Sequence, residues 1–225
     1  MMMGLSNRTL PVELAVRLRA PDRRFDGRPA AFLDRDGVIN NNGRYVNTVE
    51  DFELLPGAAR AIRRLNDAGI PVIVVTNQGS VALEYLTREE LERIHDKMDA
   101  LLATQGAHVD AVYAALAYPN GKIPELSILS PYRKPAPGML ERAEQDLGVD
   151  RDRSHMVGDA TTDIVAGRAA GCTTILVETG FAGTDGKAEA TPDHVVADLS
   201  AAVDLILDTG FAHKPQTTTQ RPTTY

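Results

Sequence analysis

The chain has 225 residues, of which 43% are hydrophobic, so it is long and apolar enough for one domain with a buried core. A net charge of −7 and a pI near 5.2 disfavour nucleic acid and anionic membranes as partners. The single cysteine, Cys172, excludes an internal disulfide and favours a reducing compartment, and no apolar run has the length of a signal peptide or a membrane span. We therefore expect a cytoplasmic protein.

Helices and strands are expected to alternate along a central region, residues 30–209, between an N-terminal extension (1–29) and a disordered tail (210–225). Within the extension, residues 12–18 suit either a strand or a helical turn. Apolar runs predict strands at 30–33, 70–75, 109–115, 155–157, 173–177 and 194–197. Residues with helical spacing, caps and glycine stops predict helices at 58–68, 137–147, 164–170 and 200–207, and one that opens with a capping box at Thr87 and Glu90.

This alternation predicts an α/β fold of three layers, Rossmann-like, with a mostly parallel central sheet and helices on both faces. In such sheets, ligands bind beyond the carboxyl ends of the strands. Four polar signals fall at those ends: Asp34 with Asp36, then Thr76-Asn77-Gln78, then Arg133-Lys134, and finally Gly158-Asp159 with Asp163. We expect the fold to bring these four signals together at one site, at the carboxyl ends of the strands.

The residue types in this set suit phosphoryl transfer. Two carboxylates as close as Asp34 and Asp36 repel each other unless a cation lies between them, and Mg²⁺ on Asp34 and Asp159 would supply that charge through oxygen ligands. Asp34 can attack phosphorus and form an aspartyl-phosphate, while Asp36 protonates the leaving alkoxide and later deprotonates the water. Lys134 and the Thr76 hydroxyl would stabilise the phosphoryl oxygens.

Each position also has a purely structural interpretation. Thr76 can simply end a strand, Lys134 can be a solvated loop charge, and Asp159 or Asp163 can cap the following helix. The turn after Asp34 can close a strand with no ligand. We favour the phosphoryl-transfer site because all of these coincidences would have to occur together, in the right order, at strand ends.

The motifs at residues 34–40, 76–78, 133–139 and 156–159 resemble those of the haloacid dehalogenase superfamily of phosphatases. Within it, the chain is similar to the branch of heptose bisphosphate phosphatases and histidinol-phosphatase domains, over residues 30–179. No large cap domain is inserted, as in the capless group, where loops or a neighbouring subunit in a homo-oligomer often exclude water. The resemblance implies a Mg²⁺-dependent phosphatase of a small phosphorylated metabolite.

The same resemblance implies a role for individual residues. Asp34 is the nucleophile, Asp36 is the acid/base and a metal ligand through its backbone carbonyl, and Asp159 completes the metal site, with which Asp163 is grouped. Thr76 and Lys134 stabilise the phosphoryl group. The implied substrate-binding residues are Asn42, Gly43, Arg44, Tyr45, Asn77, Gln78, Gly79 and Arg133.

The chain departs from its branch at several positions. The zinc-binding loop usual before the Arg-Lys-Pro motif has no counterpart, because residues 114–132 contain neither Cys nor His, and no structural zinc is expected. We expect the loop 121–129 to be held instead by packing of Ile123, Leu126, Ile128 and Leu129. An arginine usual near Leu83 and a lysine usual at Ala160 are also missing, which alters the substrate side of the site.

The function expected first is hydrolysis of a sugar phosphate such as D-glycero-D-manno-heptose 1,7-bisphosphate. Histidinol phosphate is the alternative substrate, and a catalytically altered binding or scaffold protein is the alternative of another class. A receiver-like signalling domain is disfavoured because its phosphorylated aspartate would follow the strand at 109–115, which ends without one. A polynucleotide 3′-phosphatase is disfavoured by the acidic net charge.

Overall fold

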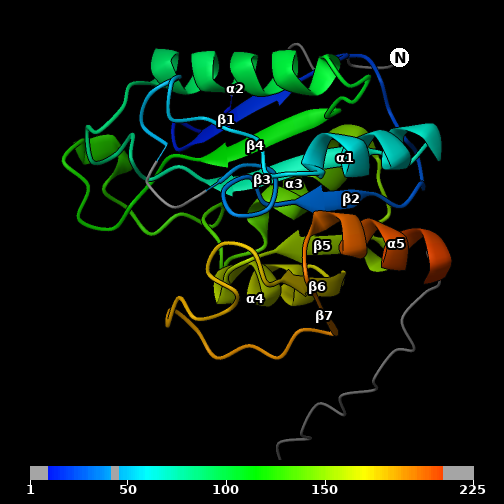
Figure 1. The fold of residues 1–225 in the computed structure, drawn as a ribbon. Helices are drawn as coiled ribbons and strands as arrows, with labels where there is room; N and C mark the ends of the chain where they lie inside the picture. Colours follow the sequence, from blue (N-terminus) through cyan, green and yellow to red (C-terminus); the bar gives the residue numbers. More distant parts are fainter. Residues whose placement is uncertain (1–9, 42–45, 210–225) are drawn as a thin grey trace, which may run out of the picture.

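The computed structural model describes residues 10–41 and 46–209 of the chain. Its centre is a seven-stranded sheet with the order β1-β4-β3-β2-β5-β6-β7, in which every neighbouring pair is parallel except β1 with β4 (Figure 1). The strands are β1 (Leu14–Leu18), β2 (Ala31–Leu33), β3 (Val72–Asn77), β4 (Ala111–Ala115), β5 (His155–Gly158), β6 (Thr173–Val177) and β7 (His194–Val196).

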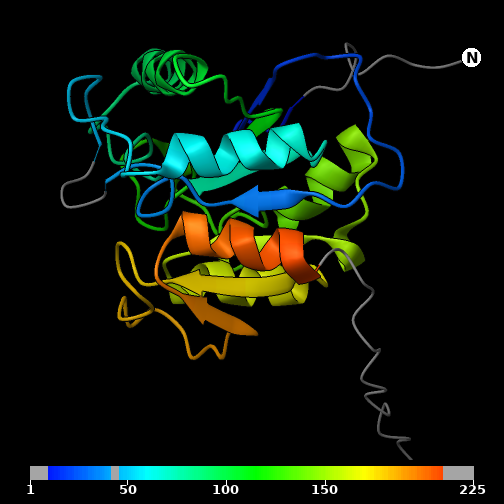
Figure 2. The same ribbon diagram turned by 45° about the vertical axis from the view of Figure 1, so that its right-hand side comes forward.

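Helices cover both faces of this sheet, and the two faces have separate cores. The helices are α1 (Ala58–Asp67), α2 (Arg88–Ala103), α3 (Gly138–Leu147), α4 (Thr161–Ala169) and α5 (Leu199–Thr209). Side chains of α1, α2 and α5 pack in one core and those of α3 and α4 in the other. Helices α1 and α5 contact each other, and the turned view in Figure 2 shows them on the same side of the sheet. The three-layer α/β fold predicted from the sequence is confirmed.

The alternation of side chains along the central strands explains why both faces are apolar. In β2, Leu33 points to the core under α1 and Phe32 to the core under α3, and β3 divides Val74 and Val75 in the same way. A strand covered on both faces needs apolar residues at every position, which is the pattern of these two segments. The sheet therefore holds the ends of β2 and β3, where the polar motifs begin, on a rigid base.

Several elements begin or end at residues other than those expected. β3 begins at Val72 because Pro71 has no N–H for the sheet, and it continues to Asn77, which pairs with Ala115 of β4. α4 begins at Thr161, three residues before the apolar positions that revealed it. The capping box is present as predicted, with Thr87 accepting from Glu90 N–H and Glu90 accepting from Thr87 N–H.

The N-terminal segment contributes to the sheet. Its strand β1 pairs antiparallel with β4, from Leu14 opposite Ala115 to Leu18 opposite Ala111, and Leu14 is buried. The sequence placed this strand in an extension outside the domain, because residues 12–18 suited either a strand or a helical turn. The boundary predicted at residue 29 lies well beyond this edge strand, and the predicted tail lies outside the described residues. Among the described helices, none combines the length and the apolar character that crossing a membrane requires.

The loop before the Arg-Lys-Pro motif is held without metal ligands of the Cys or His type. Its short helix, η2 (Pro124–Leu126), buries Leu126, and Ile123 packs against the same core. The N–H groups of Lys122 and Ile123 both donate to the carbonyl of Ala82. The prediction that Ile128 and Leu129 also anchor the loop is wrong, because Leu129 is 87% exposed and Ile128 is 38% exposed.

Candidate active site

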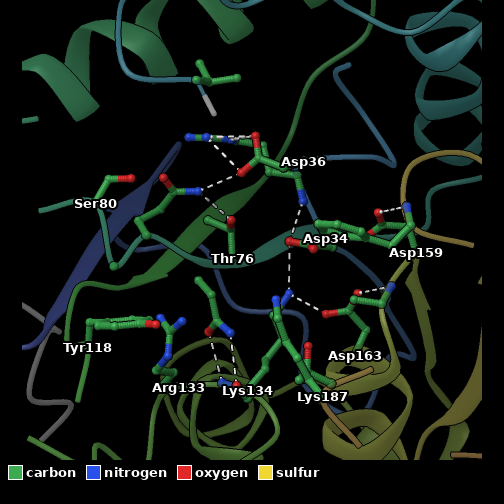
Figure 3. Close-up of a pocket in the computed structure, with 18 of the residues that line it drawn as sticks. Asp34, Asp36, Thr76, Ser80, Tyr118, Arg133, Lys134, Asp159, Asp163 and Lys187 are labelled. Atoms are coloured by element: carbon green, nitrogen blue, oxygen red, sulfur yellow. Dashed lines mark hydrogen bonds and ion pairs between the residues drawn. The ribbon is translucent and has the colours of Figure 1, made fainter. Parts of the chain in front are cut away.

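Asp34 and Lys134 form a buried ion pair at the carboxyl ends of β2 and β3. The Lys134 ammonium lies 2.9 Å from Asp34 Oδ1 and 2.7 Å from Asp163 Oδ1, and it donates to the carbonyl of Val75 at 2.8 Å (Figure 3). Burial alone would lower the pKa of Lys134, but Asp163 and Asp34 outweigh it and the net shift is upward. The ammonium therefore stays charged, and the interpretation of Lys134 as a solvated loop charge is wrong because the residue is only 2% exposed.

Asp163 is positioned by the first turn of α4. Its Oδ2 accepts the N–H of Ala160 at 3.1 Å, while Oδ1 faces Lys134. The close approach of this carboxylate depends on Gly158, because a Cβ at that position would lie 2.2 Å from Asp163 Cβ. Asp163 thus caps its helix, as the structural interpretation allowed, and also fixes the lysine.

Asp34, Asp159 and Asp163 together form a buried group of carboxylates. One oxygen from each can be chosen so that all three lie within 4.8 Å of one another. Burial, and after it the charges of Asp34 and Asp163, raise the pKa of Asp159 to about 8. Burial is also the main cause that raises the pKa of Asp34 to about 7, although Lys134 opposes it.

A hard divalent cation fits this group. The raised pKa values of Asp34 and Asp159 indicate that too little positive charge surrounds their carboxylates. Mg²⁺ prefers carboxylate and carbonyl oxygens such as those present here. Asp159 is oriented for such a role, since its Oδ2 accepts the N–H of Phe181 at 2.7 Å. Asp163 has both oxygens engaged by protein groups, so its geometry suits a neighbour of the metal better than a ligand.

Asp36 lies in a different environment from Asp34. Its carboxylate accepts from Arg35 at 2.9 Å, from Asn40 at 3.0 Å and from Gln78 at 2.9 Å. Burial would raise the pKa of Asp36, but these partners, Arg35 first, lower it. The Gln78 amide also donates to Thr76 Oγ1 at 2.8 Å, which joins the two predicted catalytic side chains.

Arg35 and His95 are parts of this site that the sequence did not reveal. Arg35 is 1% exposed, and its Nη1 lies 3.4 Å from Nε2 of His95, a buried residue of α2. Burial, with the nearby Arg35 and Arg17 charges, lowers the pKa of His95 to about 3, so its ring is neutral. The sequence held no signal for this contact, because the spacing of residues within α2 carries no information about a distant loop.

Asn77 fixes the backbone of the lysine motif. Its amide donates to the carbonyl of Lys134 and its Oδ1 accepts the N–H of Lys134, both at 2.9 Å. Beside it, the Arg133 guanidinium stacks on the ring of Tyr118, 4.8 Å from the ring centre, and donates to the Ala117 carbonyl. Gly79 leaves room for this pair, because a Cβ there would lie 2.9 Å from Tyr118 Cδ2 and 3.1 Å from Arg133 Nη1.

These groups surround one pocket of about 460 Å³. We call its buried charged base, Asp34, Lys134, Asp159 and Asp163, the floor, and the side chains Tyr118, Arg133, Phe181 and Lys187 the rim. All predicted site residues from the described part of the chain line the pocket, namely Asp34, Asp36, Thr76, Asn77, Gln78, Gly79, Arg133, Lys134, Asp159 and Asp163. The predicted loop Asn42, Gly43, Arg44 and Tyr45 lies outside the described residues.

Three rim residues were missed by the sequence interpretation. Tyr118 precedes the loop that lacks zinc ligands, and Phe181 and Lys187 lie between β6 and β7, outside any motif. An aromatic residue and a lysine within a loop are ordinary surface features, so the sequence held no signal for them. The place of Phe181 and Lys187 at the pocket follows from hydrogen bonds between the segment after β6 and residues Asp159 and Thr161.

Two family models match the chain. A model described as haloacid dehalogenase-like hydrolase matches residues 31–119, and one described as HAD-hydrolase-like matches residues 131–202. Together they span the strands that carry the floor.

Curated and solved relatives cover most of the chain. A D-glycero-D-manno-heptose-1,7-bisphosphate 7-phosphatase of Thermosynechococcus vestitus is 43% identical over 190 residues, which are 80% of this chain and 95% of the relative. The crystal structure of the D,D-heptose 1,7-bisphosphate phosphatase of B. bronchiseptica, complexed with magnesium and phosphate, matches with a TM-score of 0.71 at 33% identity, over 81% of this chain and 99% of that one. A structure from Mesorhizobium loti, described as HAD-like, matches with a TM-score of 0.77 at 33% identity, over 93% and 98% of the two chains.

Proposed function

The chain belongs to the haloacid dehalogenase-like hydrolases and is a phosphatase of that family, and we propose that it removes one phosphate from a heptose bisphosphate, D-glycero-D-manno-heptose 1,7-bisphosphate. The observation that carries the chemistry is the single ammonium of Lys134 between Asp34 and Asp163, with Asp159 beside them. The substrate is inferred from relatives that carry this name and share 36–43% of their residues with the chain.

We assign the attack on phosphorus to Asp34. Its Oδ1 is held by the Arg35 N–H at 2.7 Å and by Lys134 at 2.9 Å, which leaves Oδ2 to face the substrate. A bond forms between this oxygen and phosphorus while the bond from phosphorus to the sugar oxygen breaks. The Lys134 ammonium, which now contacts Asp34, would donate the same hydrogen bond to a phosphoryl oxygen of the bound substrate.

Proton transfer falls to Asp36. In the structure its carboxylate is held by Arg35, Asn40 and Gln78 on the side of the pocket next to Thr76. It would give a proton to the departing sugar oxygen and then take one from the water that cleaves the aspartyl-phosphate, so that one residue serves both half-reactions. Because Arg35 stabilises the ionised form, release of this pair is needed before Asp36 can act as the acid.

The residues that would hold Mg²⁺ are Asp34, Asp159 and the Asp36 backbone carbonyl, with Asp163 nearby. When bound, the ion supplies positive charge that lets an anionic nucleophile approach an anionic ester. Asp159 contributes a fixed carboxylate, because the N–H of Phe181 holds one oxygen and the N–H of Gly183 holds its backbone carbonyl. We include a cytoplasmic location and the absence of nucleic acid and membrane partners in this proposal, as composition predicted.

A hydrolysis screen tests the proposal. The purified protein is assayed with and without Mg²⁺ on the heptose bisphosphate, histidinol phosphate, a 3′-phosphorylated oligonucleotide and a set of sugar phosphates. We expect Mg²⁺-dependent release of one phosphate, with the highest kcat/KM for the heptose bisphosphate. A higher kcat/KM for histidinol phosphate would move the assignment to the alternative substrate, and no release from any ester would favour the binding protein.

A further inference from the structure

Aromatic rings and cations are paired around the pocket mouth. Three aromatic side chains line the pocket, and each ring carries a cation 4.8–5.5 Å from its centre, in the pairs Tyr118 with Arg133, Phe181 with Lys187, and Tyr85 with Lys122. Arg133 and Lys187 line the pocket themselves, whereas Lys122 does not. A ring face holds an ammonium group without neutralising its charge, so these cations remain able to bind an anion.

The charges that line the pocket divide into a compensated and an uncompensated set. Four acidic side chains line it, and four basic ones, Arg35, Arg133, Lys134 and Lys187. Lys134 is paired with Asp34 and Asp163, and Arg35 is paired with Asp36. Within the described part of the chain, Arg133 and Lys187 form no ion pair and rest on aromatic rings instead. Positive charge that the protein itself leaves unpaired is therefore concentrated at the rim.

The segment that carries Lys187 is fastened to the floor. Phe181 N–H donates to Asp159 Oδ2 at 2.7 Å, and Ala188 N–H donates to Thr161 Oγ1 at 3.1 Å. Asp185 accepts from both the N–H and the hydroxyl of Thr161, at 2.8 and 3.0 Å. Both ends of residues 181–188 are thus tied to the start of α4, which positions the backbone of Lys187 relative to the metal-binding carboxylates.

We propose that Lys187 is a specificity-determining residue that binds the second, unreacting phosphate of a sugar bisphosphate. This inference rests on the proposed function, and it adds the residue that recognises the far end of the substrate. One phosphate at the floor meets Lys134 and the metal site, so a second anionic group on the same sugar must find its positive partner elsewhere. Leu83 and Ala160 line the same pocket but carry no charge. A pocket of about 460 Å³ is large enough for a phosphorylated sugar.

The test compares substrates that differ only in that second phosphate. Steady-state kinetics are measured with D-glycero-D-manno-heptose 1,7-bisphosphate and with the corresponding 7-monophosphate, for the wild type and for Lys187→Ala, Lys187→Arg and Lys122→Ala. Lys122→Ala is the matched control, because Lys122 lies on the ring of Tyr85 but does not itself line the pocket. Circular dichroism and thermal unfolding verify that each variant is folded.

We expect Lys187→Ala to raise KM for the bisphosphate about 10-fold, the size of one lost hydrogen bond between charged groups, with kcat within twofold. Its KM for the monophosphate should be unchanged, Lys187→Arg should keep most of the preference, and Lys122→Ala should match the wild type. If the wild type prefers the bisphosphate and Lys187→Ala keeps that preference, the role of Lys187 is overturned and the proposed function stands. Equal losses on both substrates would also overturn it. A wild type with no preference for the bisphosphate would overturn both the inference and the proposed function.

Discussion

The floor and the rim of the pocket use positive charge in opposite ways. At the floor, Lys134 and Asp163 are 2% and 0% exposed, and the ammonium is bound by two carboxylates and a carbonyl. At the rim, Tyr118 and Phe181 are 38% and 44% exposed, and the cations on them have no carboxylate partner among the described residues.

This difference separates the reaction from the choice of substrate. The floor recognises what every phosphate monoester shares, a phosphoryl group with a departing oxygen, and its geometry is fixed by the ends of the central strands. The rim contacts whatever else the substrate carries, and it comes from loops. We therefore expect floor variants to change kcat for every ester, and rim variants to change KM for particular ones.

The largest expected effect is that of removing the nucleophile. Asp34→Asn should lower kcat at least about 10⁴-fold for every phosphate ester, because an amide oxygen does not attack phosphorus under these conditions. The folded state should persist, since the variant removes one of the like charges that burial already disfavours. Phosphate release and circular dichroism measure the two effects. Retained turnover on any ester would contradict the assignment of the reaction to the floor and of substrate choice to the rim.

The next prediction distinguishes the roles of the two carboxylates beside the nucleophile, Asp159 and Asp163. Asp159→Asn should raise the Mg²⁺ concentration for half-maximal activity at least about 10-fold, because it removes a proposed ligand. Asp163→Asn should instead lower kcat about 10²-fold with little change in the Mg²⁺ requirement, because it releases Lys134 from its position. Both are measured by titrating Mg²⁺ at saturating substrate. Equal shifts in the Mg²⁺ requirement would make Asp163 a ligand, as the sequence predicted.

A smaller effect tests the rim through Gly79. In Gly79→Ala the new methyl group would lie within 2.9 Å of Tyr118 and 3.1 Å of Arg133, so the stacked pair must shift. We expect KM for the heptose bisphosphate to rise about 10-fold, the size of one weakened charged hydrogen bond. Because the floor is untouched, kcat for p-nitrophenyl phosphate should stay within twofold, and a loss there would show that the two regions are not independent.

The part of the floor that follows strands could be predicted from the sequence. Asp34 and Asp159 of the floor, and Thr76 of the same pocket, each come at or just after an apolar run, and parallel strands bring their carboxyl ends to one edge, so the order of motifs implied the geometry. The predicted strand bounds were accurate to within about two residues for the same reason. A strand covered on both faces leaves little ambiguity in an apolar pattern.

The rest could not be predicted because it depends on long-range contacts without a local signal. The edge strand β1 suits a strand or a helical turn by its sequence, and it pairs only with β4, about a hundred residues later in the chain. Lys187 reaches the pocket because its segment binds Thr161, and His95 of α2 contacts Arg35, which lies 60 residues earlier in the chain. Each of these contacts is decided by the packing of loops and helices, which the period of one segment does not contain.

The last expected effect concerns stability at low pH, and it compares a buried histidine beside the site, His95, with an exposed one. Burial lowers the pKa of His95 to about 3, against about 6.5 in an unfolded chain. Below pH 6.5 the unfolded chain therefore binds a proton that the folded protein refuses until about pH 3, so the free energy of unfolding falls as pH drops through this window. One such group accounts for about 1.4 kcal/mol per pH unit.

His95→Gln removes this titration while keeping a polar side chain beside Arg35. The raised pKa values of Asp34 and Asp159 act in the opposite direction, because the folded protein then gains protons as pH falls, but they are common to both proteins and cancel in the comparison. Denaturant unfolding at pH 7, 6 and 5, without Mg²⁺, should therefore show a free energy that declines less steeply in His95→Gln than in the wild type. The exposed His194 provides the matched control variant, His194→Gln. Parallel slopes for His95→Gln and the wild type would mean that folding does not change the pKa of His95, and that burial beside Arg35 does not disfavour its charged form.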